Sequence, residues 1–164
     1  MFAGHPQSPL SPGDPLRAGL PYWPYDPNLR WRVAVQPVRS GARLSVPTGD
    51  DPPVAMTCVG RVSLPAPVGG DLDVWWLDQY GGGLFLPVRD ATAGSGSYGG
   101  GRYLLDTAKG ADLGASGDSI VIDLNFLYHP SCRYSPAWTC PLAPAGNTLH
   151  APVRAGERLP HHAS

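Results

Sequence analysis

Hydrophobic and polar residues alternate along several short stretches of this chain, with the period of two that is typical of a half-buried β-strand. In the stretch 54–64, Val54, Met56 and Cys58 begin an apolar face that continues to position 64. The stretch 72–80 is apolar on both faces, which favours a strand in the middle of a sheet. Seven stretches predict strands, at 30–38, 54–64, 72–80, 83–88, 102–107, 119–124 and 149–154.

The segments between these stretches are rich in turn-forming residues. The chain has 21 glycines and 20 prolines among its 164 residues, about twice the ordinary share. Its only lysine is Lys109 and its only glutamate is Glu157, so two good helix-forming residue types are almost absent. The spacing also leaves no room for the crossover helices of a parallel sheet. We therefore predict an all-β fold, mainly an antiparallel β-barrel or β-sandwich of about seven strands, with long Gly/Pro-rich loops and little helix.

The pattern divides the chain into two parts. Residues 1–29 are rich in proline and predict an extended arm, with Tyr22, Trp23 and Tyr25 as its anchors. Residues 30–160 predict a single β-rich domain. The chain does not start with a basic segment followed by an apolar run, and no stretch has the ~20 apolar residues of a membrane helix. We therefore expect a soluble, cytoplasmic protein.

The net charge of the chain limits the kinds of molecule that it is expected to bind. The formal net charge is −1 and the isoelectric point is about 6.5, so we do not expect the positive surface of a nucleic-acid-binding protein. The sequence has no cluster of arginine and lysine that would hold it on an anionic membrane. A small polar ligand is the partner that we expect, whereas the pattern predicts neither a particular cofactor nor an oligomeric state.

The segment 94–99 fits the G-x-G-x-x-G pattern of dinucleotide-binding proteins. In those proteins the glycines lead into a helix whose first turn holds the pyrophosphate. Here a predicted strand, 102–107, follows the glycines, so we do not predict dinucleotide binding. The segment 91–101 instead predicts a mobile or tightly folded loop.

Asp123 and Asn125 stand at the end of the predicted strand 119–124. If the strand continues by one residue, its period of two places both side chains on the same face as Val121. A buried carboxylate needs a partner, and Arg102 or the backbone around 98–101 can supply one. Two interpretations stay open: a structural network that holds the glycine-rich loop, or the lining of a pocket for a small polar ligand.

Cys132 and Cys140 lie eight positions apart in a Pro-rich segment. They can form a disulfide or pack as inert thiols. With His129 they make three candidate metal ligands, at a spacing that matches no strong zinc pattern. Cys132 is also a candidate nucleophile, with His129 or His150 as its base. These alternatives stay open, whereas Cys58 lies on the apolar face of its strand and is expected in the core.

Four blocks of the sequence occur in a recognisable order and spacing. They are 90–94 leading to 98–104; 123–125 with Tyr128, Pro130 and Cys132; 140–142 with Pro144 and Asn147; and 155–157. Together they resemble the bacterial and archaeal family catalogued as domain of unknown function 1684. A weaker match at 8–10 and 20–26 extends the resemblance. The chain departs from the family pattern at Leu124, where the family has phenylalanine, and at Gly146, where it has an acidic residue. The resemblance implies a bacterial source but no activity.

The blocks hold most of the chemically capable side chains, and we predict that these converge on a polar cleft under the loop 98–102. The candidate ligand-binding residues are Asp90, Tyr98, Arg102, Tyr103, Asp123, Asn125, Asn147 and Glu157. The first hypothesis is a binding domain in which Arg102 pairs with an anionic or carbonyl group.

Three alternatives remain. One is an enzyme that uses Asp123 or Glu157 for acid–base catalysis, or Cys132 as the nucleophile. Another is a structural or redox metal site at Cys132 and Cys140. The third is a protein-interaction surface formed by the cysteine segment and the Pro-rich arm, with Trp23 and Trp138 exposed in one patch.

Overall fold

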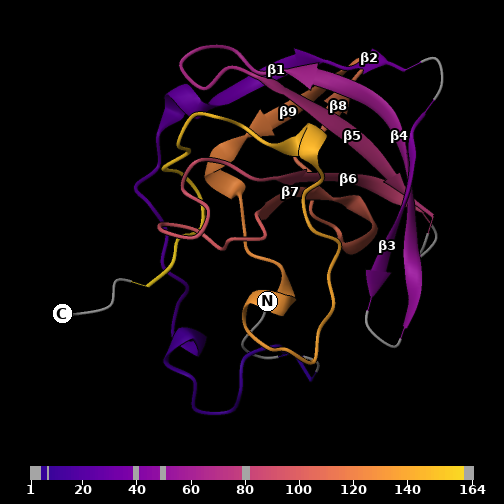
Figure 1. Cartoon of the computed structure of the whole chain (residues 1–164). Coiled ribbons are helices and arrows are strands. Elements are labelled where there is room, and N and C mark those ends of the chain that lie inside the picture. The colour runs from indigo at the N-terminus through magenta and orange to yellow at the C-terminus, as the bar shows by residue number, and fades with distance from the viewer. Residues whose placement is uncertain (1–4, 7, 39–40, 49–50, 79–81, 161–164) are drawn as a thin grey trace.

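The computed structural model describes residues 5–6, 8–38, 41–48, 51–78 and 82–160, and within them the protein is all-β (Figure 1). The strands are β1 (Arg30–Ala34), β2 (Gln36–Pro37), β3 (Arg43–Thr48), β4 (Asp51–Ser63), β5 (Asp71–Leu77), β6 (Gly83–Val88), β7 (Arg102–Asp106), β8 (Ala115–Ser116) and β9 (Ser119–Asp123). Single-turn 3₁₀ helices join them: η1 (Pro15–Arg17), η2 (Pro27–Leu29), η3 (Thr107–Lys109), η4 (Leu124–Phe126), η5 (Ser131–Arg133) and η6 (Ala145–Asn147). The predicted fold class and the near-absence of helix are confirmed.

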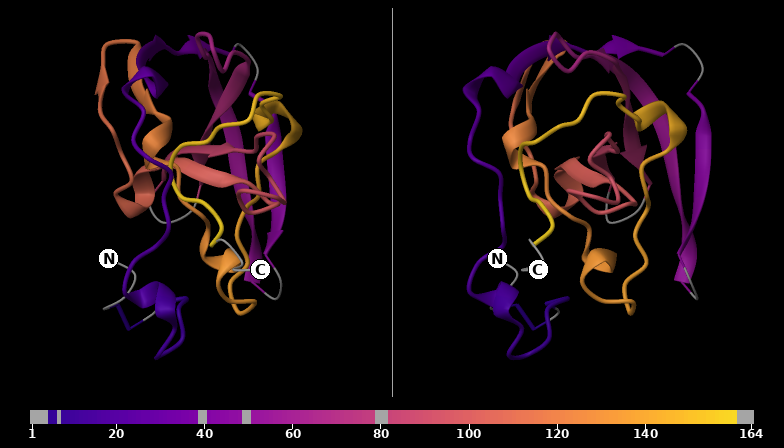
Figure 2. Two further views of the ribbon diagram at one scale, coloured as in Figure 1. Left: turned by 90° about the vertical axis from the view of Figure 1, so that its left-hand side faces the viewer. Right: turned by 60° about the vertical axis from the view of Figure 1, so that its left-hand side comes forward.

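The strands form two antiparallel sheets that are not closed into a barrel. The larger sheet has the order β2-β4-β5-β6-β7, with β3 paired to β4, and the smaller has the order β1-β9-β8. Figure 2 shows the β8–β9 hairpin on one side of the molecule and the long strands β3, β4 and β5 on the other. The strand predicted at 72–80 corresponds to β5, and its positions 79–80 lie outside the described residues. Strand β5 lies between β4 and β6 and so is central, as its pattern predicts.

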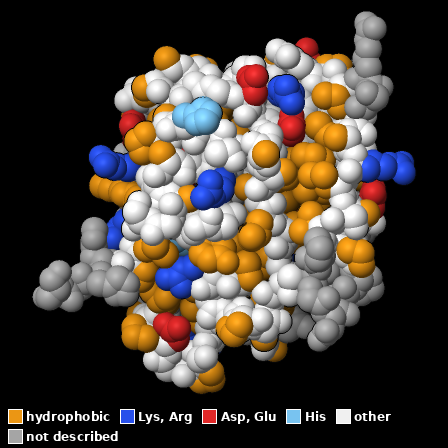
Figure 3. Space-filling view, viewed as in Figure 1, with side chains coloured by type: hydrophobic (Ala, Val, Ile, Leu, Met, Phe, Trp, Pro, Cys, Tyr) orange, Lys and Arg blue, Asp and Glu red, His pale blue; other side chains and the backbone are white. Residues whose placement is uncertain are grey.

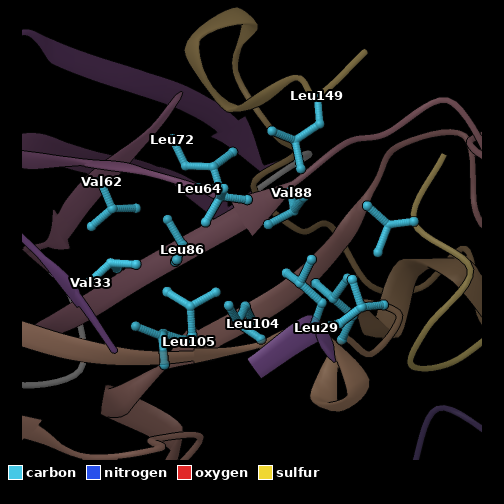
Figure 4. Packing of buried hydrophobic residues seen from close by; sticks show 14 of the residues in the cluster. Leu29, Val33, Val62, Leu64, Leu72, Leu86, Val88, Leu104, Leu105 and Leu149 are labelled. Atoms are coloured by element: carbon cyan, nitrogen blue, oxygen red, sulfur yellow. The ribbon is translucent and has the colours of Figure 1, made fainter. Parts of the chain in front are cut away.

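The main hydrophobic core fills the space between the two sheets (Figure 4). It joins Val33 of β1 and Ile122 of β9 to Val62, Leu86 and Leu104 of the larger sheet. In β4 every second residue from Val54 to Leu64 is buried, as the alternation predicts. Because both inner faces are continuous apolar surfaces, their burial is the main stabilising contribution to the fold.

One predicted strand is wrong. The segment 149–154 has no strand, and instead runs as an irregular chain beside the end of β6. Two side chains take up its backbone groups: Asp90 accepts from the N–H of Val153 at 3.0 Å, and Arg102 binds carbonyl groups in the segment 153–157. A backbone whose groups are bound by side chains is unavailable for a sheet ladder.

Two strands were not predicted, and one ends early. Strand β3 was missed because its described side chains are largely exposed, so its pattern has no buried face; β8 has only two residues. Strand β9 ends at Asp123 because that side chain accepts from the N–H of Asn125 at 3.1 Å and caps η4. The extension of this strand to Asn125 is therefore also wrong.

The N-terminal arm packs against the C-terminal segment. The N–H of Trp23 donates to the carbonyl of Gly156, and the N–H of Arg158 donates to the carbonyl of Pro21, both at 3.0 Å. These two hydrogen bonds hold residues 21–23 of the arm beside residues 156–158 of the C-terminal segment. No helix among the described residues has the length and apolar character needed to cross a membrane.

Candidate functional site

Arg102, at the start of β7, is fully buried between the loop after β6 and the C-terminal segment. Its Nη2 lies 2.7 Å from Oδ2 of Asp90, in an ion pair that is itself buried. The guanidinium group also donates to three backbone carbonyls in the segment 153–157, and it lies 5.2 Å from the ring centroid of Trp23. Burial lowers the pKa of Arg102, an effect that Asp90 opposes. Arg102 is thus a clamp between three chain segments rather than a group that faces solvent.

Glu157 and His129 form a second buried network beside this clamp. Oε2 of Glu157 accepts from the backbone N–H of His129 at 2.8 Å, and Oε1 lies 3.1 Å from Nδ1 of the same residue. The hydroxyl of Tyr134 also donates to Oε1. Nε2 of His129 accepts from the backbone N–H of Tyr98 at 3.2 Å. Because this acceptor and both carboxylate oxygens are occupied, the geometry does not favour Glu157 or His129 as a catalytic base.

Asp123 and Asn125 bind the N-terminal arm instead of Arg102. The side chain of Asn125 accepts from the N–H of Asp26 at 2.9 Å and donates to the carbonyl of the same residue at 2.8 Å. Oδ2 of Asp123 lies 3.6 Å from Nε of Arg30 and accepts from the hydroxyl of Tyr25 at 3.4 Å. The sequence-based pairing of Asp123 with Arg102 is therefore wrong, and these polar groups attach the arm to the smaller sheet.

Asn147 is fully buried and all its polar atoms are bound. Its Oδ1 accepts from the indole N–H of Trp75 at 2.8 Å. Its Nδ2 donates to the carbonyls of Asp73 and Pro87, at 2.8 and 2.9 Å. Asn147 thus attaches η6 to β5 and β6, a structural role that explains its place among the buried polar residues.

The glycine-rich loop between β6 and β7 is tightly folded. The carbonyl of Thr92 accepts from the N–H groups of Ser95, Gly96 and Ser97 at 2.8–3.1 Å. The hydroxyls of Thr92 and Ser97 are 2.8 Å apart and both residues are buried. A strand follows the loop, as the sequence predicts, and Gly101 has a φ of 91° where a side chain would meet the carbonyl of Val88. The loop is therefore held in one conformation and presents a fixed surface to neighbouring groups.

A hollow of about 330 Å³ opens on the outer side of this loop. It is lined by Trp23, Thr92, Ser95, Gly96, Arg154 and Arg158, with proline and aliphatic residues between them. We call it the arginine hollow. Figure 3 shows several blue side chains, the colour of arginine and lysine, on the left-hand half of one face of the molecule, where Figure 1 places the C-terminal segment. Among the described residues that line the hollow there is no aspartate or glutamate, so the charged side chains of this lining are all positive.

The two arginines of the hollow differ in how firmly they are held. Nε of Arg158 donates to the carbonyl of Tyr22 at 3.3 Å and its Nη1 to that of Leu159 at 3.2 Å, which fixes the side chain. Arg154 is exposed and has no ion pair within the described chain. These two arginines are not among the residues predicted from the sequence motifs; the available signal was two arginines four positions apart in an otherwise weakly charged segment.

Cys132 and Cys140 are free thiols that lie near one another and next to the hydroxyl of Tyr98. The N–H of Cys132 points to Sγ of Cys140 at 3.4 Å. Within the described residues no three histidine, cysteine, aspartate or glutamate side chains are grouped as metal ligands. The ring of His129 is bound to Glu157 and to the backbone of Tyr98, so the structure does not direct it toward the two sulfurs.

The predicted single site is thus divided into separate clusters. Asp90, Arg102 and Glu157 do come together, but as an internal network, and Tyr98 lies next to it through His129. Asp123 and Asn125 bind the N-terminal arm, and Asn147, the last residue of η6, binds Trp75 of β5. The hydroxyl of Tyr103 donates to the carbonyl of Pro141 at 2.6 Å, next to the cysteines.

The chain was compared with known families and structures. The profile of the family described as "Protein of unknown function (DUF1684)" matches residues 18–158. The chain belongs to the DUF1684 family. It is also similar to the solution NMR structure of an uncharacterized protein from Haloarcula marismortui, with 33% identity and a TM-score of 0.68 over 96% of this chain and 86% of that one. No curated protein matches the sequence.

Gly146 of η6 lies directly against β5. A Cβ atom at Gly146 would clash with Oδ2 of Asp73. Asp73 is nearly buried and its Oδ1 accepts from Arg61 at 2.8 Å. A carboxylate from β5 therefore already occupies the space in front of η6, and a side chain at 146 would displace it.

Proposed function

We propose that this DUF1684 domain binds a small anionic molecule, one that carries a carboxylate or phosphate group, in the arginine hollow. The observation that carries the proposal is the pair of guanidinium groups, Arg154 and Arg158, in a hollow whose lining has no acidic side chain. Arginine binds carboxylates and phosphates through paired N–H donors in a fixed plane. An anion in the hollow would neutralise two cations that line the same hollow.

The walls of the hollow suit a small ligand because they are already rigid. The loop 92–97 is closed by its own hydrogen bonds, and the N–H of Leu159 donates to the carbonyl of Gly96 at 2.8 Å. Trp23 is fixed over the buried guanidinium of Arg102 and contributes an aromatic surface. A preformed site loses little conformational entropy when a ligand binds.

A second hollow, of about 340 Å³, adjoins the first across Pro152 and Arg154. Its lining includes Leu29, Pro67 and Val68, so it is more apolar than the arginine hollow, although the carboxylate of Asp26 also belongs to it. A ligand with an acidic head near the arginines and an apolar remainder along this surface would use both. The proposed ligand therefore lies beside residues 91–96 of the loop and not under 98–102, where Arg102 is enclosed.

The test is an amide NMR titration with sodium phosphate and, separately, sodium succinate, against sodium chloride at matched ionic strength. We expect saturable shifts at Gly96, Arg154 and Arg158 with one of the two anions and only small, non-saturable changes with chloride. The phosphate and succinate arms distinguish the two ligand chemistries.

The variants Arg154→Gln and Arg158→Gln, combined, should weaken binding by at least about tenfold, since each charge-assisted hydrogen bond contributes on the order of 1.5–3 kcal/mol. Arg32→Gln is the matched control, because Arg32 is an exposed arginine on β1 outside the hollow. Equal weakening in the control, or no saturable shift with either anion, would contradict the proposal.

A further inference from the structure

The cysteine pair is the strongest feature that the proposed ligand site does not use. Cys132 lies in η5 and Cys140 in the irregular segment that follows. The Cys132 N–H donates to Sγ of Cys140 at 3.4 Å. The Cys132 thiol donates to the hydroxyl of Tyr98 at 3.9 Å. Both cysteines belong to a segment without strand pairing, so a small local adjustment can bring the two neighbouring sulfurs to bonding distance.

The surroundings of the two sulfurs are unequal. The neighbouring Cys132 side chain is the main cause that lowers the pKa of Cys140 to about 6, with smaller contributions from the Cys132 N–H, Lys109 and Tyr103, while burial opposes them. The neighbouring Cys140 side chain, together with burial, raises the pKa of Cys132. Cys140, whose sulfur accepts from the Cys132 N–H, is therefore the sulfur that ionises more readily, and a thiolate beside a second thiol is the arrangement that thiol–disulfide exchange requires.

Cys58 supplies an internal comparison. It is buried in β4, its sulfur lies 3.4 Å from the carbonyl of Gly60, and burial raises its pKa. Cys132 and Cys140 are instead half-buried, so a small molecule can reach them. The chain therefore contains one inert core thiol and one accessible pair.

We propose that Cys132 and Cys140 are a thiol–disulfide exchange site, at which the Cys140 thiolate attacks the disulfide of a small thiol compound. In the first step a bond forms between Cys140 and one sulfur of the small disulfide, whose own S–S bond breaks and releases a thiolate. In the second step Cys132 gives up its proton to that thiolate, or to water, and attacks the Cys140 sulfur. A second small thiolate leaves, so two cysteines are oxidised and one small disulfide is reduced to two thiols.

A disulfide between Cys132 and Cys140 would restrain the segment 132–143, which packs against the glycine-rich loop. Gly100 has the Leu142 side chain packed against it, and its carbonyl accepts from the N–H of Ala143 at 3.5 Å. This segment also presents Trp138 and Leu142 at the surface, with exposed fractions of 38% and 42%. Oxidation would remove the thiol that Cys132 offers to Tyr98 and fix the segment in one position.

The experiment equilibrates the native protein with mixtures of reduced and oxidised glutathione, quenches with acid, and maps the cysteines by alkylation and peptide mass. We expect the wild type to lose two hydrogens in the peptide pair that contains Cys132 and Cys140, with Cys58 still reduced. The variant Cys132→Ser should accumulate a mixed disulfide on Cys140, whereas Cys140→Ser should form at least about tenfold less on Cys132 at neutral pH.

Cys58→Ser is the control and should behave as the wild type does. The wild-type mapping needs no substitution, so it decides the question even if a serine variant fails to fold. Oxidation that appears only in denaturant, that involves Cys58 equally, or that leaves both thiols reduced in excess oxidised glutathione would overturn the proposal. None of these results depends on whether an anion binds in the arginine hollow.

Discussion

Arg102 shows how one buried side chain organises distant parts of this chain. Its ion pair with Asp90 and its bonds to the segment 153–157 replace the hydrogen bonds that a strand would make there. A buried charge is costly unless every donor and acceptor around it is satisfied. Here the only donor of Arg102 without a hydrogen-bond partner is Nε. This residue was predicted as a ligand contact from its type and motif, but its surroundings give it a structural role.

The first prediction concerns Arg102→Met. Loss of the guanidinium leaves the Asp90 carboxylate and three carbonyls without their partner, so the free energy of unfolding should fall by about 3–5 kcal/mol. Urea unfolding monitored by tryptophan fluorescence measures this. Arg32→Met, at an exposed position of β1, should change stability by no more than about 0.5 kcal/mol. Similar small losses in both variants would show that Arg102 is not a clamp.

At the scale of elements, short polar contacts take the place of long helices and long strands. Asn125 holds η2 and the arm through both backbone groups of Asp26, and Asp123 ends β9 by capping η4. The arm residues Trp23 and Leu29 then cover the C-terminal segment and the core. The arm is therefore part of the folded domain rather than a separate tail.

The second prediction follows for Asn125→Ala. Removal of the amide leaves the N–H and carbonyl of Asp26 without their partners. The docked state of the arm should therefore lose about 1–3 kcal/mol of stability. Hydrogen exchange at Asp26 should accelerate, and limited proteolysis should cut within residues 18–29 before the rest. Asn28→Ala is the control: it removes an exposed hydrogen bond from the Asn28 amide to the Asp26 side chain but leaves both backbone partners of Asp26 in place, so proteolysis should be nearly unchanged. Unchanged exchange in the Asn125 variant would contradict the role assigned to this residue.

At the scale of the whole molecule, buried phenol groups connect several of the clusters. Burial is the main cause that raises the pKa of Tyr103, Tyr128 and Tyr134. The hydroxyl of Tyr103 donates to Pro141 and that of Tyr134 donates to Glu157, so both are neutral donors inside the fold. An unfolded tyrosine ionises at a pH of about 10.

The third prediction is a loss of stability in alkali. Because the pKa values are raised in the folded state, these tyrosines contribute stability that is fully present below a pH of about 10 and declines as the pH rises toward the folded values. The urea midpoint should therefore fall above a pH of about 10, and tyrosinate absorbance should appear together with unfolding. Tyr103→Phe should make the decline less steep. Ionisation of all the tyrosines without unfolding would refute this account.

Much of the fold follows from the sequence, because burial on one face of a strand repeats every two residues and can be read locally. The alternation in β4, the doubly apolar β5 and the scarcity of lysine and glutamate predict the all-β class and its core. Strand β3 and the segment 149–154 could not be predicted, because their backbone conformation is set by pairing and by side chains from elsewhere.

The candidate sites depend more strongly on tertiary structure. Sequence motifs selected Asp90, Arg102, Cys132 and Cys140 as chemically capable, but could not say that Arg102 would be enclosed, or that Arg154 and Arg158 would share a hollow with Trp23. Amino-acid type and spacing determine which groups can ionise, donate hydrogen bonds or be buried, and these are local properties. Which groups meet is decided by contacts between residues tens of positions apart, and only the folded chain specifies those contacts.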